Sequence, residues 1–141
     1  METVIQELTR GNATEVKVIL ASVVAALAVY QVALMAVGYG KVKPRFLGGR
    51  AASFAHRAIG DALVVIVVVV AVMCVSYFGI EDDAAVHSGA AVLLLVALAM
   101  KVGVVRGLPR LHRFLPVLGL TIWVLIGVVF ATSAGDFLWS R

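Results

Sequence analysis

The sequence predicts an all-α integral membrane protein, folded as an antiparallel bundle of four transmembrane helices. Of the 141 residues, 62% are hydrophobic, whereas soluble domains are about 45–50% apolar. Charged residues make up only 14% of the chain, and they lie in short segments between apolar runs. Each run is near or above the ~20 residues that cross a bilayer core. No stretch is polar enough for a separate soluble domain, so we expect a single membrane domain over residues 1–141.

Short polar segments separate the four predicted helices. These helices span about residues 16–37, 54–80, 85–105 and 109–134. Ser53 is the expected N-cap of the second helix, Pro109 fits the first position of the fourth, and Pro116 should bend its first turns. A helix, a basic loop and a helix that starts with His-Arg occur twice, and this repeat would place the second and fourth helices across the bundle diagonal.

The distribution of basic residues predicts the orientation. One side of the bundle would carry Lys41, Lys43, Arg45, Arg50, Arg57, Lys101, Arg106, Arg110 and Arg113, and the other side would carry Arg10, Lys17 and Arg141. By the positive-inside rule, both termini face the outer side and both basic loops face the cytoplasm. Because these cations flank membrane segments, we expect contact with the lipid bilayer and none with nucleic acid. The expected location is a bacterial or archaeal inner membrane.

Two His-Arg pairs, His56-Arg57 and His112-Arg113, stand near the starts of the second and fourth helices. Both helices enter from the same side, so the two imidazoles should lie at nearly the same depth, about three residues into each helix. His87 opens the third helix on the opposite side, separated by most of a core of about 30 Å. The two histidines of the pairs can therefore share one metal ion, which His87 cannot join.

The neighbours of these two histidines favour haem b as the cofactor. Gly60 follows His56 by four residues, and Pro116 and Gly119 follow His112 by four and seven. These positions share the helical faces of the histidines and leave room for a ring edge. Iron held by two imidazoles has no open coordination position, which favours electron transfer over oxygen chemistry. Zinc fits less well, because only two histidines are at this depth.

Cations at the same end of the bundle suit the two haem propionates. Lys101 follows His87 by fourteen residues, close to four turns, so the two should share one face of the third helix. We expect Lys101 and an arginine, either Arg57 or Arg113, to bind the propionates. Asp61 either pairs with Arg57, four residues earlier, or relays protons within the membrane.

Other polar residues have structural interpretations as well as functional ones. Histidines at helix ends are commonly interfacial, and His87 is either such a residue, a cap for the third helix, or a ligand of a second haem on the outer side with Met73 as its partner. Gln31, in the first helix, should form an interhelical hydrogen bond, with Asp61 within reach.

The pattern resembles the b-type membrane cytochromes of the cytochrome b561-like kind. The resemblance covers residues 53–134 and rests on the two His-Arg helix starts, on His87-Ser88-Gly89 at the start of the third helix, and on the compact four-span plan. It implies haem b held by His56 and His112. Such cytochromes usually hold two haems with four histidines, whereas this chain has three histidines, so transfer across the whole membrane would need a further carrier.

The predicted function is that of a membrane cytochrome b which exchanges electrons with quinone or with a partner redox protein. It would act as an electron-transfer protein or as a subunit of a larger membrane complex rather than as a stand-alone enzyme. The alternative is a haem-free accessory or assembly subunit, whose histidines and arginines are interfacial. A small transporter is disfavoured, because Asp61 and Gln31 are the only clearly polar groups well inside the spans.

Overall fold

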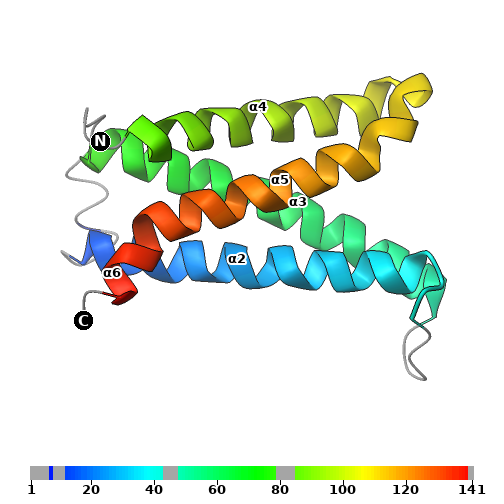
Figure 1. Cartoon of the computed structure of the whole chain (residues 1–141), viewed down its shortest axis with the longest axis horizontal. Helices are drawn as coiled ribbons and strands as arrows, with labels where there is room; N and C mark the ends of the chain where they lie inside the picture. The colour runs from blue at the N-terminus through cyan, green and yellow to red at the C-terminus, as the bar shows by residue number, and fades with distance from the viewer. Residues whose placement is uncertain (1–6, 8–11, 43–47, 79–84, 140–141) are drawn as a thin grey trace.

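The computed structural model is a bundle of antiparallel helices and describes residues 7, 12–42, 48–78 and 85–139 (Figure 1). Its elements are α2 (Ala13–Gly38), α3 (Gly49–Met73), the π-helical turn η1 (Cys74–Phe78), α4 (Ala85–Gly107), the 3-10 helix η3 (Pro109–Phe114), α5 (Leu115–Phe130), the π-helical turn η4 (Ala131–Gly135) and α6 (Asp136–Trp139). Within the described residues there is no strand, and four helical segments are long and apolar enough to cross a membrane. The prediction of a four-helix membrane bundle is confirmed at this level.

The start of α3 differs from the prediction. The helix begins at Gly49, after Gly48 in an extended conformation, so Ser53 lies in the second turn and is not the N-cap. The segment Arg50-Ala51-Ala52 consists of strong helix formers, which extend the helix beyond the apolar run. His56 therefore lies seven residues after the start of its helix instead of about three. Lys43, Arg45, the predicted helix end at residue 80 and the acidic turn 81–83 lie outside the described residues.

The fourth span begins with 3-10 geometry rather than with a bent α-helix. In an α-helix the N–H of Pro116 would donate to the carbonyl of His112, but proline has no N–H. The N–H of Leu115 donates to that carbonyl instead, which is the three-residue spacing of a 3-10 helix. The sequence predicted a bend at Pro116, whereas the structure has tighter 3-10 winding just before it, so His112 lies in η3 rather than in an α-helix.

The helices form two hairpins. α2 packs along α3 and α4 packs along α5, while the main contact between hairpins joins α2 and α5. α3 and α5 thus lie across the bundle from each other, as the predicted repeat requires. The start of α2 and the short helix α6 lie at one end of the bundle, which we call the termini end (Figure 1).

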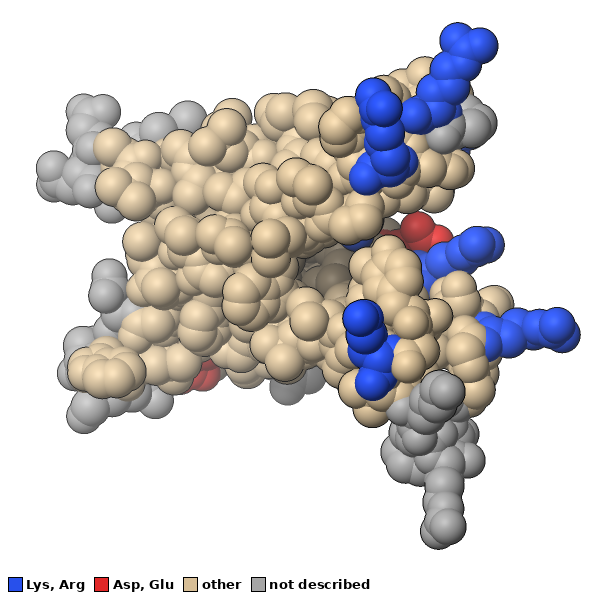
Figure 2. All heavy atoms as spheres, turned by 45° about the vertical axis from the view of Figure 1, so that its right-hand side comes forward, with Lys and Arg blue, Asp and Glu red and all other residues tan. Residues whose placement is uncertain are grey.

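At the opposite end the two hairpins separate, and basic side chains gather there (Figure 2). We call it the basic end. Six exposed cations define it: Lys41, Arg50, Arg57, Arg106, Arg110 and Arg113. Figure 2 also shows a hollow in the surface between the hairpins, close to these side chains. Six of the nine cations used to predict the orientation therefore lie on one surface of the described chain, while Lys43 and Arg45 lie outside the described residues and Lys101 is half-buried.

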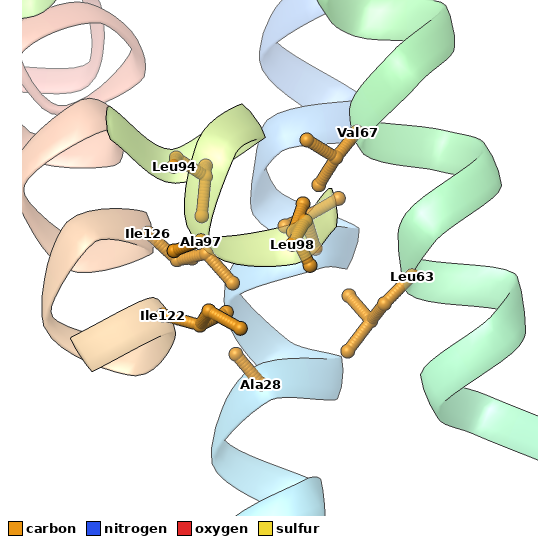
Figure 3. Packing of buried hydrophobic residues seen from close by; sticks show 9 residues of the cluster. Ala28, Leu63, Val67, Leu94, Ala97, Leu98, Ile122 and Ile126 are labelled. Atoms are coloured by element: carbon orange, nitrogen blue, oxygen red, sulfur yellow. The ribbon is translucent and has the colours of Figure 1, made fainter. Parts of the chain in front are cut away.

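A single cluster of buried apolar side chains joins all four spans near the middle of the bundle (Figure 3). Its members are Val24, Ala28, Leu63, Val67, Leu94, Ala97, Leu98, Ile122 and Ile126, and we call it the core cluster. Spacings of three and four residues within each helix place its members on one helical face. Small side chains such as Ala28 and Ala97 allow the helix backbones to approach closely, which is how helices associate in lipid.

Leu94→Ala should destabilise the bundle more than Leu93→Ala. Leu94 is 4% exposed and Leu93 is 59% exposed, so only the first substitution leaves a cavity. We expect a loss of about 2 kcal/mol, the lower end of the range for Leu-to-Ala changes in protein cores, because lipid replaces water around the separated helices. Unfolding of both variants in detergent, followed by circular dichroism, measures the difference. Equal losses would contradict the assignment of Leu94 to the core.

Candidate cofactor site at the basic end

One helical turn beyond the core cluster, towards the basic end, every span contributes a polar or very small residue. Each of these residues is three positions from a core-cluster residue of its own helix and so lies on the same face. They are Gln31 after Ala28, Gly60 before Leu63, Lys101 after Leu98 and Gly119 before Ile122. All four are half-buried. We call this set the polar layer, and it joins three of the predicted site residues.

His56 lies one turn beyond Gly60 on α3 and contacts the polar layer. The Gln31 side chain donates a hydrogen bond from Nε2 to the main-chain carbonyl oxygen of His56, at 2.8 Å. Lys101 of α4 belongs to the same layer, on the α4 side of the bundle. The structure therefore places His56, Gly60 and Lys101 at the same end of the bundle.

Two buried polar atoms at this place have no hydrogen-bond partner among the described residues. They are Nδ1 of His56 and Oε1 of Gln31. Native structures rarely leave such atoms unsatisfied, and each one needs an explanation, such as a bound water or a functional role. Both atoms belong to the two residues that the 2.8 Å hydrogen bond joins. This unsatisfied pair is the clearest chemical signal that the sequence did not reveal.

The two glycines of the layer have different surroundings. A Cβ atom on Gly60 would lie 3.5 Å from Nε2 of Gln31, so an amide occupies the space above this glycine. A Cβ atom on Gly119 would meet nothing within 4 Å. Room for a ring edge, predicted at both positions, is therefore present only beside Gly119 in this arrangement of side chains.

The remaining predicted residues lie outside the polar layer. His112, Arg57 and Arg113 are all exposed at the basic end, and the Arg113 guanidinium lies 4.8 Å from the centre of the Phe114 ring. The 3-10 winding explains the position of His112. Each residue turns 120° in a 3-10 helix and 100° in an α-helix, so the three steps to Leu115 rotate His112 by about 60° from the face that an α-helix would give it.

Asp61 does not form the pairs that the sequence analysis offered for it. Asp61 and Arg57 are both exposed, and no ion pair between these two described side chains is found within the structure. Gln31 does form the predicted interhelical hydrogen bond, but with the carbonyl of His56 rather than with Asp61. Asp61 is one residue past Gly60, which rotates it by about 100° away from the polar layer.

A second polar contact lies at the termini end. Nδ1 of His87 is 3.1 Å from the hydroxyl oxygen of Thr132, and that hydroxyl lies 2.8 Å from the carbonyl of Val128, to which it donates. A hydroxyl has one proton, so when the Thr132 hydroxyl donates to Val128, its oxygen accepts from a His87 ring that has its proton on Nδ1. Sequence reasoning missed Thr132, although both residues lie at the outer ends of their predicted helices. No set of three or more metal-ligating side chains is found within the described ranges.

The partner proposed for a second haem is packed elsewhere. Met73 is buried with Ala13, and Val16 and Leu20 pack against the pair. Among the described residues, His87 has the polar contact with Thr132, which is that of an interhelical hydrogen-bonded residue.

Residues 2–140 match the model of a family described as a family of unknown function (DUF6529). None of the curated proteins and none of the solved structures matches the chain. The function therefore has to be inferred from the chain's own geometry.

Thr132→Val should free the Nδ1 proton of His87 and loosen the contact of α4 with η4. The expected loss is about 0.6 kcal/mol, the average for an interhelical hydrogen bond in a membrane protein. Ser133→Ala is the matched control, because the Ser133 hydroxyl donates to the carbonyl of Val129 in its own helix. Unfolding in detergent measures both changes. If Thr132→Val has the same free energy of unfolding as the unaltered protein, the His87–Thr132 contact does not contribute to stability.

Proposed function

The chain belongs to the DUF6529 family, and we propose that it is a membrane-bound b-type cytochrome that carries electrons. Haem b would lie at the basic end between the two hairpins, with His56 and His112 as its axial ligands. Bound by two imidazoles, haem iron supplies one-electron transfer and leaves no position for a substrate. The observation that supports the proposal is the half-buried His56 beside the polar layer, at the end where the hairpins separate.

The residues of the polar layer suit a porphyrin with two carboxylates. Lys101 is half-buried inside a span, and an ionisable residue in such a position is costly and is commonly functional. A propionate would give its ammonium group a charge-assisted hydrogen bond. The open space beside Gly119 offers room on the α5 side, across the bundle from His56.

His112 belongs to the other hairpin and is exposed on η3. A cofactor bound by both histidines would join the two hairpins at the end where they separate. Arg57 and Arg113 flank the two ligands in the sequence and are exposed, so either can reach a propionate at the rim. These chain residues therefore provide two ligands and three cations from both hairpins.

The position of the proposed haem determines which partners can exchange electrons with it. With both termini on the outer side, in a bacterial or archaeal inner membrane, the haem lies near the cytoplasmic face. The exposed cations of the basic end attract an acidic protein surface and speed its association. Electrons would pass between quinone and a partner redox protein, and transfer to the outer face would need a further carrier, as in a larger membrane complex.

A second candidate is a haem-free accessory or assembly subunit of a membrane complex. The exposure of His112, Arg57 and Arg113 favours it, because interfacial residues that bind a neighbouring subunit or lipid headgroups have this exposure. A cytochrome absorbs visible light through its haem, whereas a haem-free subunit is colourless, so a visible absorption spectrum distinguishes the two candidates.

The detergent-purified protein should show a sharp b-type α band in a reduced-minus-oxidised spectrum, with one haem per chain by pyridine haemochrome. A preparation that stays colourless after reconstitution with hemin would contradict the cytochrome and favour the accessory subunit. Two haems per chain would instead restore His87 as a ligand.

His56→Ala and His112→Ala should each abolish the haem band, because loss of either imidazole opens the coordination of a bis-histidine iron. His87→Ala is the matched control, since His87 bonds Thr132 at the termini end, and this variant should keep the full band. The measurement is haem per chain after hemin titration of each folded variant. Full retention in either of the first two variants would show that its histidine is not a ligand.

The orientation predicts the behaviour of reporter fusions. Alkaline phosphatase joined after Arg141 should be active, because this enzyme needs an oxidising outer compartment for its disulfides. The same reporter in the loop between α2 and α3 should be inactive, since the positive-inside rule assigns this loop to the cytoplasm. The opposite pattern would reverse the orientation and put the proposed haem near the outer face.

A further inference from the structure

We propose that Gln31 is a positioning residue that holds the His56 imidazole with its proton on Nδ1, which leaves Nε2 free to bind a metal. The tautomer follows from the contacts of this chain alone. Its use in haem binding rests on the proposed function.

The first step concerns the orientation of the Gln31 amide. Its Nε2 lies 2.8 Å from the carbonyl oxygen of His56, and a carbonyl oxygen only accepts hydrogen bonds. The reversed amide would place two oxygens against each other, so the observed orientation is the stable one. Oε1 is therefore the free atom of the amide, and it is an acceptor.

The second step concerns what can satisfy that acceptor. Oε1 of Gln31 and Nδ1 of His56 are both buried and without a partner among the described residues. The two residues already touch through the carbonyl bond. A small rotation of the amide lets Nδ1–H donate directly to Oε1 and satisfies both atoms. With Nδ1 as the acceptor the amide oxygen would face a second acceptor, so this direct contact requires the Nδ1–H tautomer.

The termini end provides an internal comparison. His87 is also half-buried, and its Nδ1 lies 3.1 Å from the hydroxyl of Thr132, which donates to the Val128 carbonyl. With the ring proton on Nδ1, His87 has an oxygen acceptor on a neighbouring element, which is the arrangement inferred for His56. A metal-binding histidine is fixed in the same way, because the hydrogen bond of one ring nitrogen orients the other towards the metal.

Gly60 keeps the approach of Gln31 to α3 open. A Cβ there would lie 3.5 Å from Nε2 of Gln31, which is ordinary contact, whereas a larger side chain would occupy the amide's place. The glycine that the sequence analysis assigned to a porphyrin edge thus serves the positioning amide.

The tautomer is tested first without haem. In detergent-solubilised protein labelled with 15N-histidine, long-range proton–nitrogen correlations should show His56 with a protonated Nδ1. Gln31→Leu should convert His56 to a mixture of tautomers, and Gln31→Glu should restore the Nδ1–H form because its carboxyl group keeps an acceptor. Ser22→Ala is the control on the same helix, because the Ser22 hydroxyl donates to its own helix at Val18. His87 serves as the reference and should not change.

An unchanged His56 in Gln31→Leu, or a proton on Nε2 in the unaltered protein, would overturn the inference. Circular dichroism confirms that each variant is helical. If Gln31→Leu does not fold, Gln31→Glu still decides, because a tautomer other than Nδ1–H in this variant contradicts the assigned role.

Hemin titration then tests the consequence for the site. Gln31→Leu should weaken haem binding about 10- to 100-fold, as loss of an outer-shell partner of a ligand does, and should raise the reduction potential because the imidazole becomes a poorer donor. Gln31→Glu should retain binding. If the unaltered protein binds haem and Gln31→Leu has the same haem affinity and reduction potential, the positioning role of Gln31 is wrong while the proposed function stands. A colourless unaltered protein with a Gln31-dependent tautomer overturns only the proposed function.

Discussion

The absence of water around the four spans is the constraint on which the rest of the structure depends. In a bilayer core, backbone groups and buried polar side chains must find partners inside the protein, and two polar residues of the spans find theirs on another helix. Gln31 does so by donating to the carbonyl of His56, and His87 does so at the other end by contacting Thr132. The polar layer thus occupies the same helical faces as the core cluster, because these faces are turned towards the other helices of the bundle.

The spans and their number were predictable, because length and apolarity decide which segments cross a membrane. The gathering of cations at one end followed from the same four-span topology. The place of Lys101 at the same end of the bundle as His56 was also implied, since the fourteen-residue spacing from His87 assigned Lys101 to an inward face. These inferences depend on periodicity and on loop length, which are local properties of the sequence.

Features that depend on single backbone groups, such as a helix start or a hydrogen-bond partner, were harder to predict from the sequence. The helix start at Gly49 reflects the propensity of Arg50-Ala51-Ala52 rather than the apolar boundary at Phe54. The 3-10 winding of η3 depends on one missing N–H, that of Pro116, and it moves His112 off the face that simple helical counting gave it. The partner of Gln31 was a main-chain carbonyl, which a search for paired side chains does not consider.

The two histidines of the proposed site differ in how firmly the chain holds them, and the difference follows from the hairpins. His56 lies well inside α3, where α2 supports it through Gln31. His112 lies on a short 3-10 turn that packs only on α4 and α5 among its substantial contacts. A cofactor that engages His56 first would meet a fixed ligand, and the second ligand would come from the more adaptable segment. The free energy of binding would then act on the separation of the hairpins at the basic end, which Figure 2 shows apart.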